Sequence, residues 1–170
     1  MLIQTYKDEE LQEIQDRVES HSSQINSLVN KIIEPYVSGL DKYVTFISNC
    51  LKDGNQAPTD EELEDFCLNL STQIYFASGA CEQLGIRDDM SKEVYKEVFN
   101  TFRDEVTGTI ADKDAYAELN AQKEQIINIA YARAYKILKS KIDNAQEMLN
   151  SCKKVLTRRT ECLALSKMTR

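Results

Sequence analysis

Glycine, proline and tryptophan are scarce in this chain. It has five Gly, two Pro and no Trp in 170 residues, whereas globular proteins contain about 7% Gly and about 5% Pro. Because glycine and proline weaken or interrupt helices, their scarcity predicts long helices. Val and Ile do not gather in alternating runs, so the sequence predicts no strand. We therefore expect an all-α protein.

Long apolar runs are missing as well. The first eight residues contain no apolar segment of the kind that secretory signals carry, and no stretch approaches the roughly 18 apolar residues that span a membrane. We expect a cytoplasmic protein (in the host cytoplasm if a phage encodes it) with no membrane partner.

Metal-ligating residues are few and scattered. His21 is the only histidine, and the number of cysteines is odd, with no pair at CxxC spacing. The cysteines are Cys50, Cys67, Cys81, Cys152 and Cys162. We interpret them as reduced thiols that pack like small hydrophobic residues, and we expect neither a metal nor a cofactor.

Enzyme motifs are also absent. The chain contains no phosphate-binding glycine loop, no HExxH and no GxSxG motif, which predicts a protein that is not an enzyme. The acidic run over residues 60–65 does not change this expectation. Consecutive carboxylates on a helix point to different sides, and acidic residues are common in the first turn of a helix.

A heptad pattern dominates the start of the chain. Apolar residues recur at alternating three- and four-residue spacings, which is typical of a coiled-coil seam and implies a partner helix. The seam consists of Leu11, Ile14, Val18, His21, Ile25, Leu28 and Ile32. Two roles fit His21 there, namely a polar residue that sets the register and a pH switch. The helix is expected to start near Thr5 and to break or restart at Pro35.

The best boundary lies at residues 53–58, where Gly54, Asn55 and Pro58 interrupt the helical pattern. It divides the chain into an N-terminal helical arm (1–52) and a helical domain (59–170). Thr59 and Glu62 have the spacing of a capping box and predict a helix start. We expect that helix to end at Gly85, and a further helix over 91–106.

The last third of the chain predicts one long helix. From Asp112 or Asp114, either of which can cap its start, to about Leu165 there is no Gly and no Pro. Fifty residues at 1.5 Å each would extend about 75 Å. The expected architecture is an elongated all-α bundle with a long C-terminal helix and a coiled-coil-like arm, with length to spare for a homo-oligomer.

Charge changes sign along the chain. Residues 1–114 hold 10 Lys/Arg against 23 Asp/Glu, a net charge of −13, and residues 115–170 hold 11 against 5, a net charge of +6. A basic helix on an acidic body can bind a polyanion, or it can pair with its own acidic helices.

At 100° per residue, one set of cations projects away from the apolar stripe of the long helix. This outer basic ridge consists of Arg133, Lys136, Lys139, Lys153, Lys154 and Arg158. Tyr131 and Tyr135 lie at its border, and cations beside aromatic rings suit single-stranded nucleic acid. A solvated face whose tyrosines pack at the core edge explains the same pattern.

A second set of cations falls inside the apolar stripe. Lys123, Lys141 and Arg159 are 18 residues apart, which is five full turns, so they line up with one another. Buried cations require partners. Ion pairs with the acidic half of the chain, within one subunit or between subunits, are the simpler interpretation, and a basic groove between subunits is the other.

Four sequence segments resemble the recombination mediator proteins of T4-type bacteriophages over about residues 59–165. They are Leu70-Ser71-Thr72-Gln73-Ile74-Tyr75, Arg103-Asp104-Glu105-Val106-Thr107-Gly108, Asp114-Ala115-Tyr116-Ala117-Glu118-Leu119 and Ala134-Tyr135-Lys136-Ile137-Leu138-Lys139-Ser140-Lys141-Ile142-Asp143. The resemblance implies a small helical oligomer that binds single-stranded DNA and helps to load a recombinase. It carries over Arg103 as a DNA contact.

Two functions follow as expectations. The first is a recombination or replication accessory protein that binds single-stranded DNA as a helical homo-oligomer, through the ridge, Arg103, Arg159 and the two tyrosines. The second is an acidic protein-binding scaffold, or an inhibitor of a host defence protein, whose 1–114 surface engages a basic partner.

Overall fold

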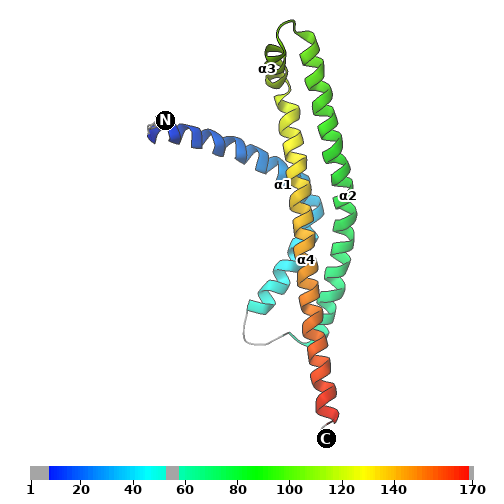
Figure 1. The fold of residues 1–170 in the computed structure, drawn as a ribbon. Coiled ribbons are helices and arrows are strands. Elements are labelled where there is room, and N and C mark those ends of the chain that lie inside the picture. The colour runs from blue at the N-terminus through cyan, green and yellow to red at the C-terminus, as the bar shows by residue number, and fades with distance from the viewer. Residues whose placement is uncertain (1–7, 53–57, 169–170) are drawn as a thin grey trace, which may run out of the picture. The chain divides into compact units, whose positions relative to one another are not determined.

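The computed structural model describes residues 8–52 and 58–168, and they form four helices (Figure 1). These are α1 (Asp8–Lys52), α2 (Asp60–Glu105), α3 (Ile110–Asn120) and α4 (Gln122–Met168). No strand occurs in these two ranges, so the all-α prediction is confirmed. Nor does any helix within them contain a segment long and apolar enough to cross a membrane.

Helix α1 contains Pro35 in its interior, so the expected break or restart at this residue is wrong. Proline removes one backbone hydrogen bond, but apolar burial on both sides can offset that loss. Val29 and Ile33 before the proline are buried, and Val37 and Leu40 after it are buried as well. The predicted helix start at Thr5, and most of the predicted boundary at 53–58, lie outside the described residues.

Helix α2 begins as predicted and ends later than predicted. The backbone N–H of Thr59 donates to Oε2 of Glu62 (2.8 Å), and the N–H of Glu62 donates to Oγ1 of Thr59 (3.2 Å), which completes the capping box. Gly85 does not end the helix, because α2 continues to Glu105. A glycine inside a helix costs about 1 kcal/mol, and this one lies against the ring of Tyr135.

The expected single C-terminal helix is divided into α3 and α4 at Ala121. Thr109, rather than Asp112 or Asp114, is the N-cap of α3, and Asp112 is its capping-box partner. Ala121 is fully buried, and its N–H donates to the carbonyl oxygen of Ala117. A small buried residue thus divides the helices without the Gly or Pro that sequence reasoning requires.

The chain forms two compact units, each described here by itself. One combines residues 1–32, as far as they are described, with 88–134, and the other combines 33–87 with 135–170, again as far as described. The division of the chain into an arm of 1–52 and a domain of 59–170 stays a prediction.

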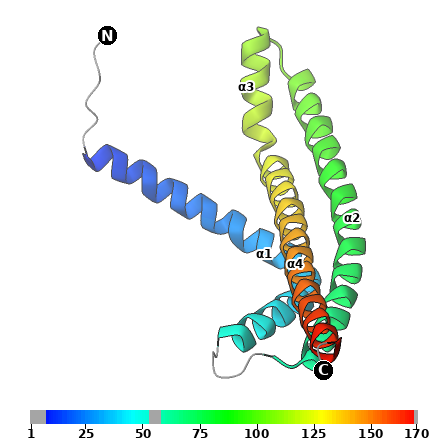
Figure 2. The ribbon, with the colours of Figure 1, turned by 60° about the horizontal axis from the view of Figure 1, so that its bottom comes forward.

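The second unit has a three-helix core. Its buried side chains come from α1 (Leu40, Ile47), α2 (Leu63, Phe66, Leu70, Ala77) and α4 (Ala145, Leu149, Cys152). Helices α2 and α4 are antiparallel, since Asp60 contacts Arg159 and Gly85 contacts Tyr135. The two helices also run alongside each other in both ribbon views (Figures 1 and 2).

In the first unit, the C-terminal part of α2 packs on α3 and on the start of α4. The rings of Phe102 and Tyr116 meet edge to face, with centroids 6.3 Å apart. Arg103 Nε lies 2.7 Å from Asp114 Oδ1. Ala117, Ala121 and Ala130 are completely buried, so small side chains bring these helices close together.

Candidate nucleic-acid interface

The outer basic ridge is exposed along α4. All six of its cations are exposed, which confirms that they face away from the core. Five of them (Lys136, Lys139, Lys153, Lys154 and Arg158) belong to the second unit, and Arg133 belongs to the first. The core of the second unit places them, because Leu138, Ala145 and Leu149 are buried on the opposite side of α4.

None of the five cations forms an ion pair within the described residues. Their charges are therefore balanced by solvent ions, which a polyanion would displace. The ridge is not continuous, because the exposed side chains of Asp143 and Glu147 lie between Lys139 and Lys153. The cations form two clusters whose nearest members are 14 residues, or about 21 Å, apart.

Two of the three cations that were predicted to face inward are consumed by ion pairs. Lys141 Nζ lies 2.5 and 2.7 Å from the carboxylate oxygens of Asp41 in α1. Arg159 Nη1 lies 2.9 Å from Asp60 Oδ1 and donates to the carbonyl oxygen of Pro58 at 2.6 Å. Lys123 is exposed and has no ion pair among the described residues. Arg159 is thus committed to the start of α2.

Arg103, the residue that the resemblance carries over, is also engaged. It pairs with Asp114, and both side chains remain about 40% exposed. A phosphate would have to compete with this carboxylate. The structure does not bring Arg103 together with the cluster at Lys153 and Lys154, because they belong to different units.

The two predicted stacking residues are half-buried. The ring of Tyr135 lies against Gly85, where an added Cβ would come within 3.3 Å of its Cε2 atom. Part of the ring therefore serves the packing of α4 on α2. Tyr131 is half-buried in the other unit.

Exposed aromatic rings occur elsewhere, on α2. Tyr75 and Phe76 are 76% and 66% exposed, and their rings meet edge to face with centroids 5.6 Å apart. Sequence reasoning missed them, because Tyr75 was noted only as part of a family segment. Their surroundings are acidic rather than basic, with Glu64 and Glu82 exposed on the same helix.

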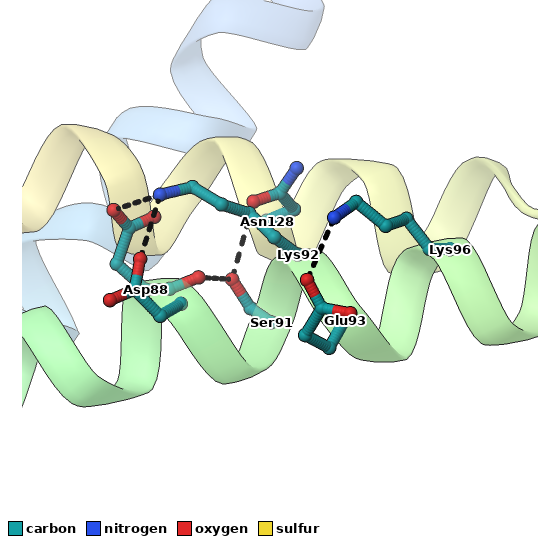
Figure 3. A network of polar contacts seen from close by, with 7 residues as sticks. Asp88, Ser91, Lys92, Glu93, Lys96 and Asn128 are labelled. Atoms are coloured by element: carbon teal, nitrogen blue, oxygen red, sulfur yellow. Dashed lines mark hydrogen bonds and ion pairs between the residues drawn. The ribbon is translucent and has the colours of Figure 1, made fainter.

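The first unit contains a buried polar network between α2 and α4 (Figure 3). Ser91 Oγ lies 2.8 Å from the carbonyl oxygen of Asp88 and 3.3 Å from Asn128 Oδ1. Lys92 Nζ donates to Asp88 Oδ2 at 2.8 Å, and this contact helps to raise the pKa of Lys92. The other carboxylate oxygen of Asp88 is buried without a hydrogen-bond partner in the described residues.

The cysteines behave as the sequence indicated. Cys81 and Cys152 are buried and Cys162 is exposed, and all five are free thiols. Burial raises the pKa of the Cys67, Cys81 and Cys152 thiols above the usual range. In the described residues no group of His, Cys, Asp and Glu has the arrangement of a metal site.

The predicted oligomer seam on α1 is only partly covered. Leu11, Ile14 and Val18 are 45–60% exposed, His21 is exposed, and Ile25, Leu28 and Ile32 are half-buried. The buried stripe of α1 runs instead through Val29 and Ile33. The first part of the seam thus has an open apolar face.

Comparison of the chain with protein-family models, with curated proteins and with solved structures finds no match in any of the three.

Proposed function

We propose that this protein binds single-stranded nucleic acid through the outer basic ridge and acts as a helical homo-oligomer. One observation carries the proposal. The cations that face the protein are neutralised by Asp41 and Asp60, whereas the five ridge cations of the second unit have no carboxylate partner among the described residues. The positive charge of α4 that remains available is therefore the charge on its outer face.

The two clusters suggest how a strand would lie. Lys136 and Lys139 form one contact, and Lys153, Lys154 and Arg158 form the other, about 21 Å away along α4. A strand that reaches both clusters avoids the carboxylates of Asp143 and Glu147 between them. Because lysines hold phosphates as point charges, such binding depends little on base sequence.

The oligomer is proposed to form through the seam on α1. Val18 and Ile25 occupy one core position of the heptad and are β-branched, which favours two-stranded coiled coils when the helices are parallel. Replacing Ile14 and Val18 by Asp is expected to lower the mass measured by sedimentation equilibrium, while far-UV circular dichroism stays unchanged. A wild-type protein that sediments as a monomer would refute this part of the proposal.

The biological setting rests on the resemblance to phage recombination mediators. We propose DNA recombination or replication as the process, with a recombinase or a host protein as a further partner. Arg103, Arg159 and the tyrosines contribute to DNA contact in this proposal only if they give up the internal contacts described above.

Fluorescence anisotropy with labelled oligo-dT at about 50 mM and about 200 mM salt tests nucleic-acid binding. The test variant carries Glu at Lys136, Lys139, Lys153 and Lys154, and the control carries Glu at two exposed cations of α1, Arg17 and Lys31. We expect salt-sensitive binding that the first variant loses and the second retains. No binding at the lower salt concentration, or equal loss in both variants, would contradict the proposal.

A second candidate function is a scaffold or inhibitor that binds a basic protein. The observation that favours it is the group of exposed apolar side chains on the acidic helix α2, where Leu68, Tyr75, Phe76 and Ile86 are each at least 65% exposed. Exposed apolar groups in a contiguous patch are typical of protein-binding surfaces.

A further inference from the structure

The outward face of α2 carries a second apolar pattern. Within the part of α2 that belongs to the second unit, side chains recur at positions 68, 72, 75, 79, 82 and 86, which are alternating spacings of four and three residues. This spacing keeps them on one side of the helix. We call Leu68, Thr72, Tyr75, Gly79 and Ile86 the outer stripe.

The outer stripe lies opposite the core. Residues Leu63, Leu70, Ala77 and Leu84 are buried, and at 100° per residue they project from the other side of α2. Leu68 is 69% exposed, Tyr75 is 76% exposed and Ile86 is 65% exposed. No other described helix of this unit covers them, since helices that packed on the stripe would reduce these values.

Gly79 marks the middle of the stripe. A Cβ atom added at this position would meet nothing within 4 Å, so the packing of this chain does not require a glycine there. Glycine inside a helix costs about 1 kcal/mol relative to alanine. A glycine next to Thr72 and Tyr75 lowers the surface locally and allows the backbone of a second helix to approach closely.

The flanks of the stripe are acidic. Glu61, Glu64, Asp65 and Glu82 are exposed, and none of them forms an ion pair within the described residues. Between residues 60 and 87 the helix holds six carboxylates and one cation, Arg87. The guanidinium of Arg87 donates to the hydroxyl of Tyr36 and so is held toward α1.

We propose that the outer stripe is a docking site for an amphipathic helix of a partner protein, with apolar residues at three- and four-residue spacing between flanking Lys and Arg side chains. The distance from Leu68 to Ile86 is 18 residues, so the stripe is about 27 Å long and accommodates about five turns of the partner. The carboxylates pair with its cations, and Tyr75 with its neighbour Phe76 supplies the aromatic anchor that protein interfaces favour.

Charge selects this occupant over a second copy of the chain. Pairing two outer stripes would place the carboxylates of one helix against those of the other, which is unfavourable. The outward face of α4 does not match the stripe either. Its exposed apolar residues Ile137 and Val155 lie 18 residues apart, with Asp143 and Glu147 between them.

This inference makes the second candidate function specific and rests on it. It is independent of nucleic-acid binding, because the outer stripe and the ridge lie on different helices. A single set of variants can therefore separate the two proposals.

The test uses the full chain and two synthetic peptides of two heptads each, identical in pattern, one made of Leu and Lys and the other of Leu and Glu. Binding is measured by isothermal titration calorimetry. We expect the Leu/Lys peptide to bind the protein in a saturable way, with one peptide to each chain, and the Leu/Glu peptide not to bind.

The variant L68D/Y75D discriminates docking from charge attraction. It adds two negative charges, so attraction by charge alone would increase, whereas docking loses two apolar anchors and weakens by about tenfold for each. The matched control I137D/V155D places the same changes on exposed apolar residues of α4, and we expect it to bind the peptide like the wild type.

Binding of the Leu/Lys peptide by L68D/Y75D at wild-type strength or above would overturn the proposal, and so would absence of binding to the wild type. A lower sedimentation mass of L68D/Y75D without peptide would overturn it in favour of a second copy of the chain. Oligo-dT binding by L68D/Y75D is expected to match that of the wild type. A loss of peptide binding therefore cannot be mistaken for a failure of the nucleic-acid proposal.

Discussion

Replacing Gly79 by Ala should stabilise the protein. Gly79 lies inside α2 with φ and ψ of a helix, and its added Cβ would enter open space. Alanine is favoured over glycine in a helix interior by about 0.8–1.0 kcal/mol, and no packing contact is lost to offset this gain. For a chain of this length, about 1 kcal/mol raises Tm by about 2–4 °C.

Gly85 provides the matched control in the same helix. Its added Cβ would lie 3.3 Å from Cε2 of Tyr135, so the ring, which packs between α4 and α2, must shift by a few tenths of an ångström. The helix-propensity gain is the same, and the crowding opposes it. We expect Gly85→Ala to be less stable than Gly79→Ala.

Urea denaturation followed by far-UV circular dichroism measures both variants against the wild type. The midpoint should rise for Gly79→Ala with an unchanged m-value, because the same surface becomes exposed on unfolding. A Gly79→Ala protein that is no more stable than the wild type would refute the reasoning, since it would mean that the outer stripe is already covered. Equal gains for both glycines would refute the role assigned to Tyr135.

Three further predictions concern caps, ion pairs and thiols. Thr109→Ala should destabilise the protein by about 1 kcal/mol in urea denaturation, and because hydrogen bonds from Thr109 lower the pKa of Asp112, the stabilisation linked to this carboxylate is present above the ordinary Asp pKa of about 3.9 and is lost as the pH falls through the lowered value, so the variant should lose less stability in acid. Arg159→Ala removes the partner of Asp60 and should cost about 1–2 kcal/mol, with a loss below about 0.5 kcal/mol, as for an ordinary surface residue, counting against the ion pair. Cys162, which is exposed, should react with a chromogenic disulfide reagent before the buried thiols, whose pKa values burial raises, and simultaneous reaction of all five would contradict the described core.

Sequence reasoning predicted the interior of the second unit well. The alignment of Lys141 and Arg159 within the apolar stripe of α4 correctly indicated carboxylate partners, which are Asp41 and Asp60. It succeeded because a cation inside an apolar stripe has few alternatives to an ion pair. The capping box at Thr59 was predictable for a similar reason, since its geometry depends only on neighbours along the chain.

The errors arose where tertiary packing outweighs local preference. Gly85 was read as a helix end, but the ring of Tyr135, which is distant in sequence, occupies the space that the missing side chain leaves. Ala121 was invisible as a break because alanine favours helices, and only its complete burial explains the change of helix there. No local pattern contains either contact.

The open surface of α2 was missed because it carries apolar residues on two faces. The stripe through Leu63 and Leu70 was predicted to face the core, and Tyr75 was not weighed as a surface residue. A second stripe at helical spacing is a sequence signal for a further partner, and it could have been found by asking which apolar residues the first stripe leaves unused.

The salt dependence of nucleic-acid binding tests the central claim most directly. For single strands, the slope of log K against log salt concentration is about −0.7 for each phosphate that is neutralised, so the five ridge cations of the second unit predict a slope of about −3.5. Replacing Lys153 and Lys154 by Ala should reduce its magnitude by about 1.4, while replacing Arg17 and Lys31 by Ala should leave it unchanged. A slope that stays the same when the two ridge lysines are removed would contradict the assignment of the outer basic ridge as the nucleic-acid interface.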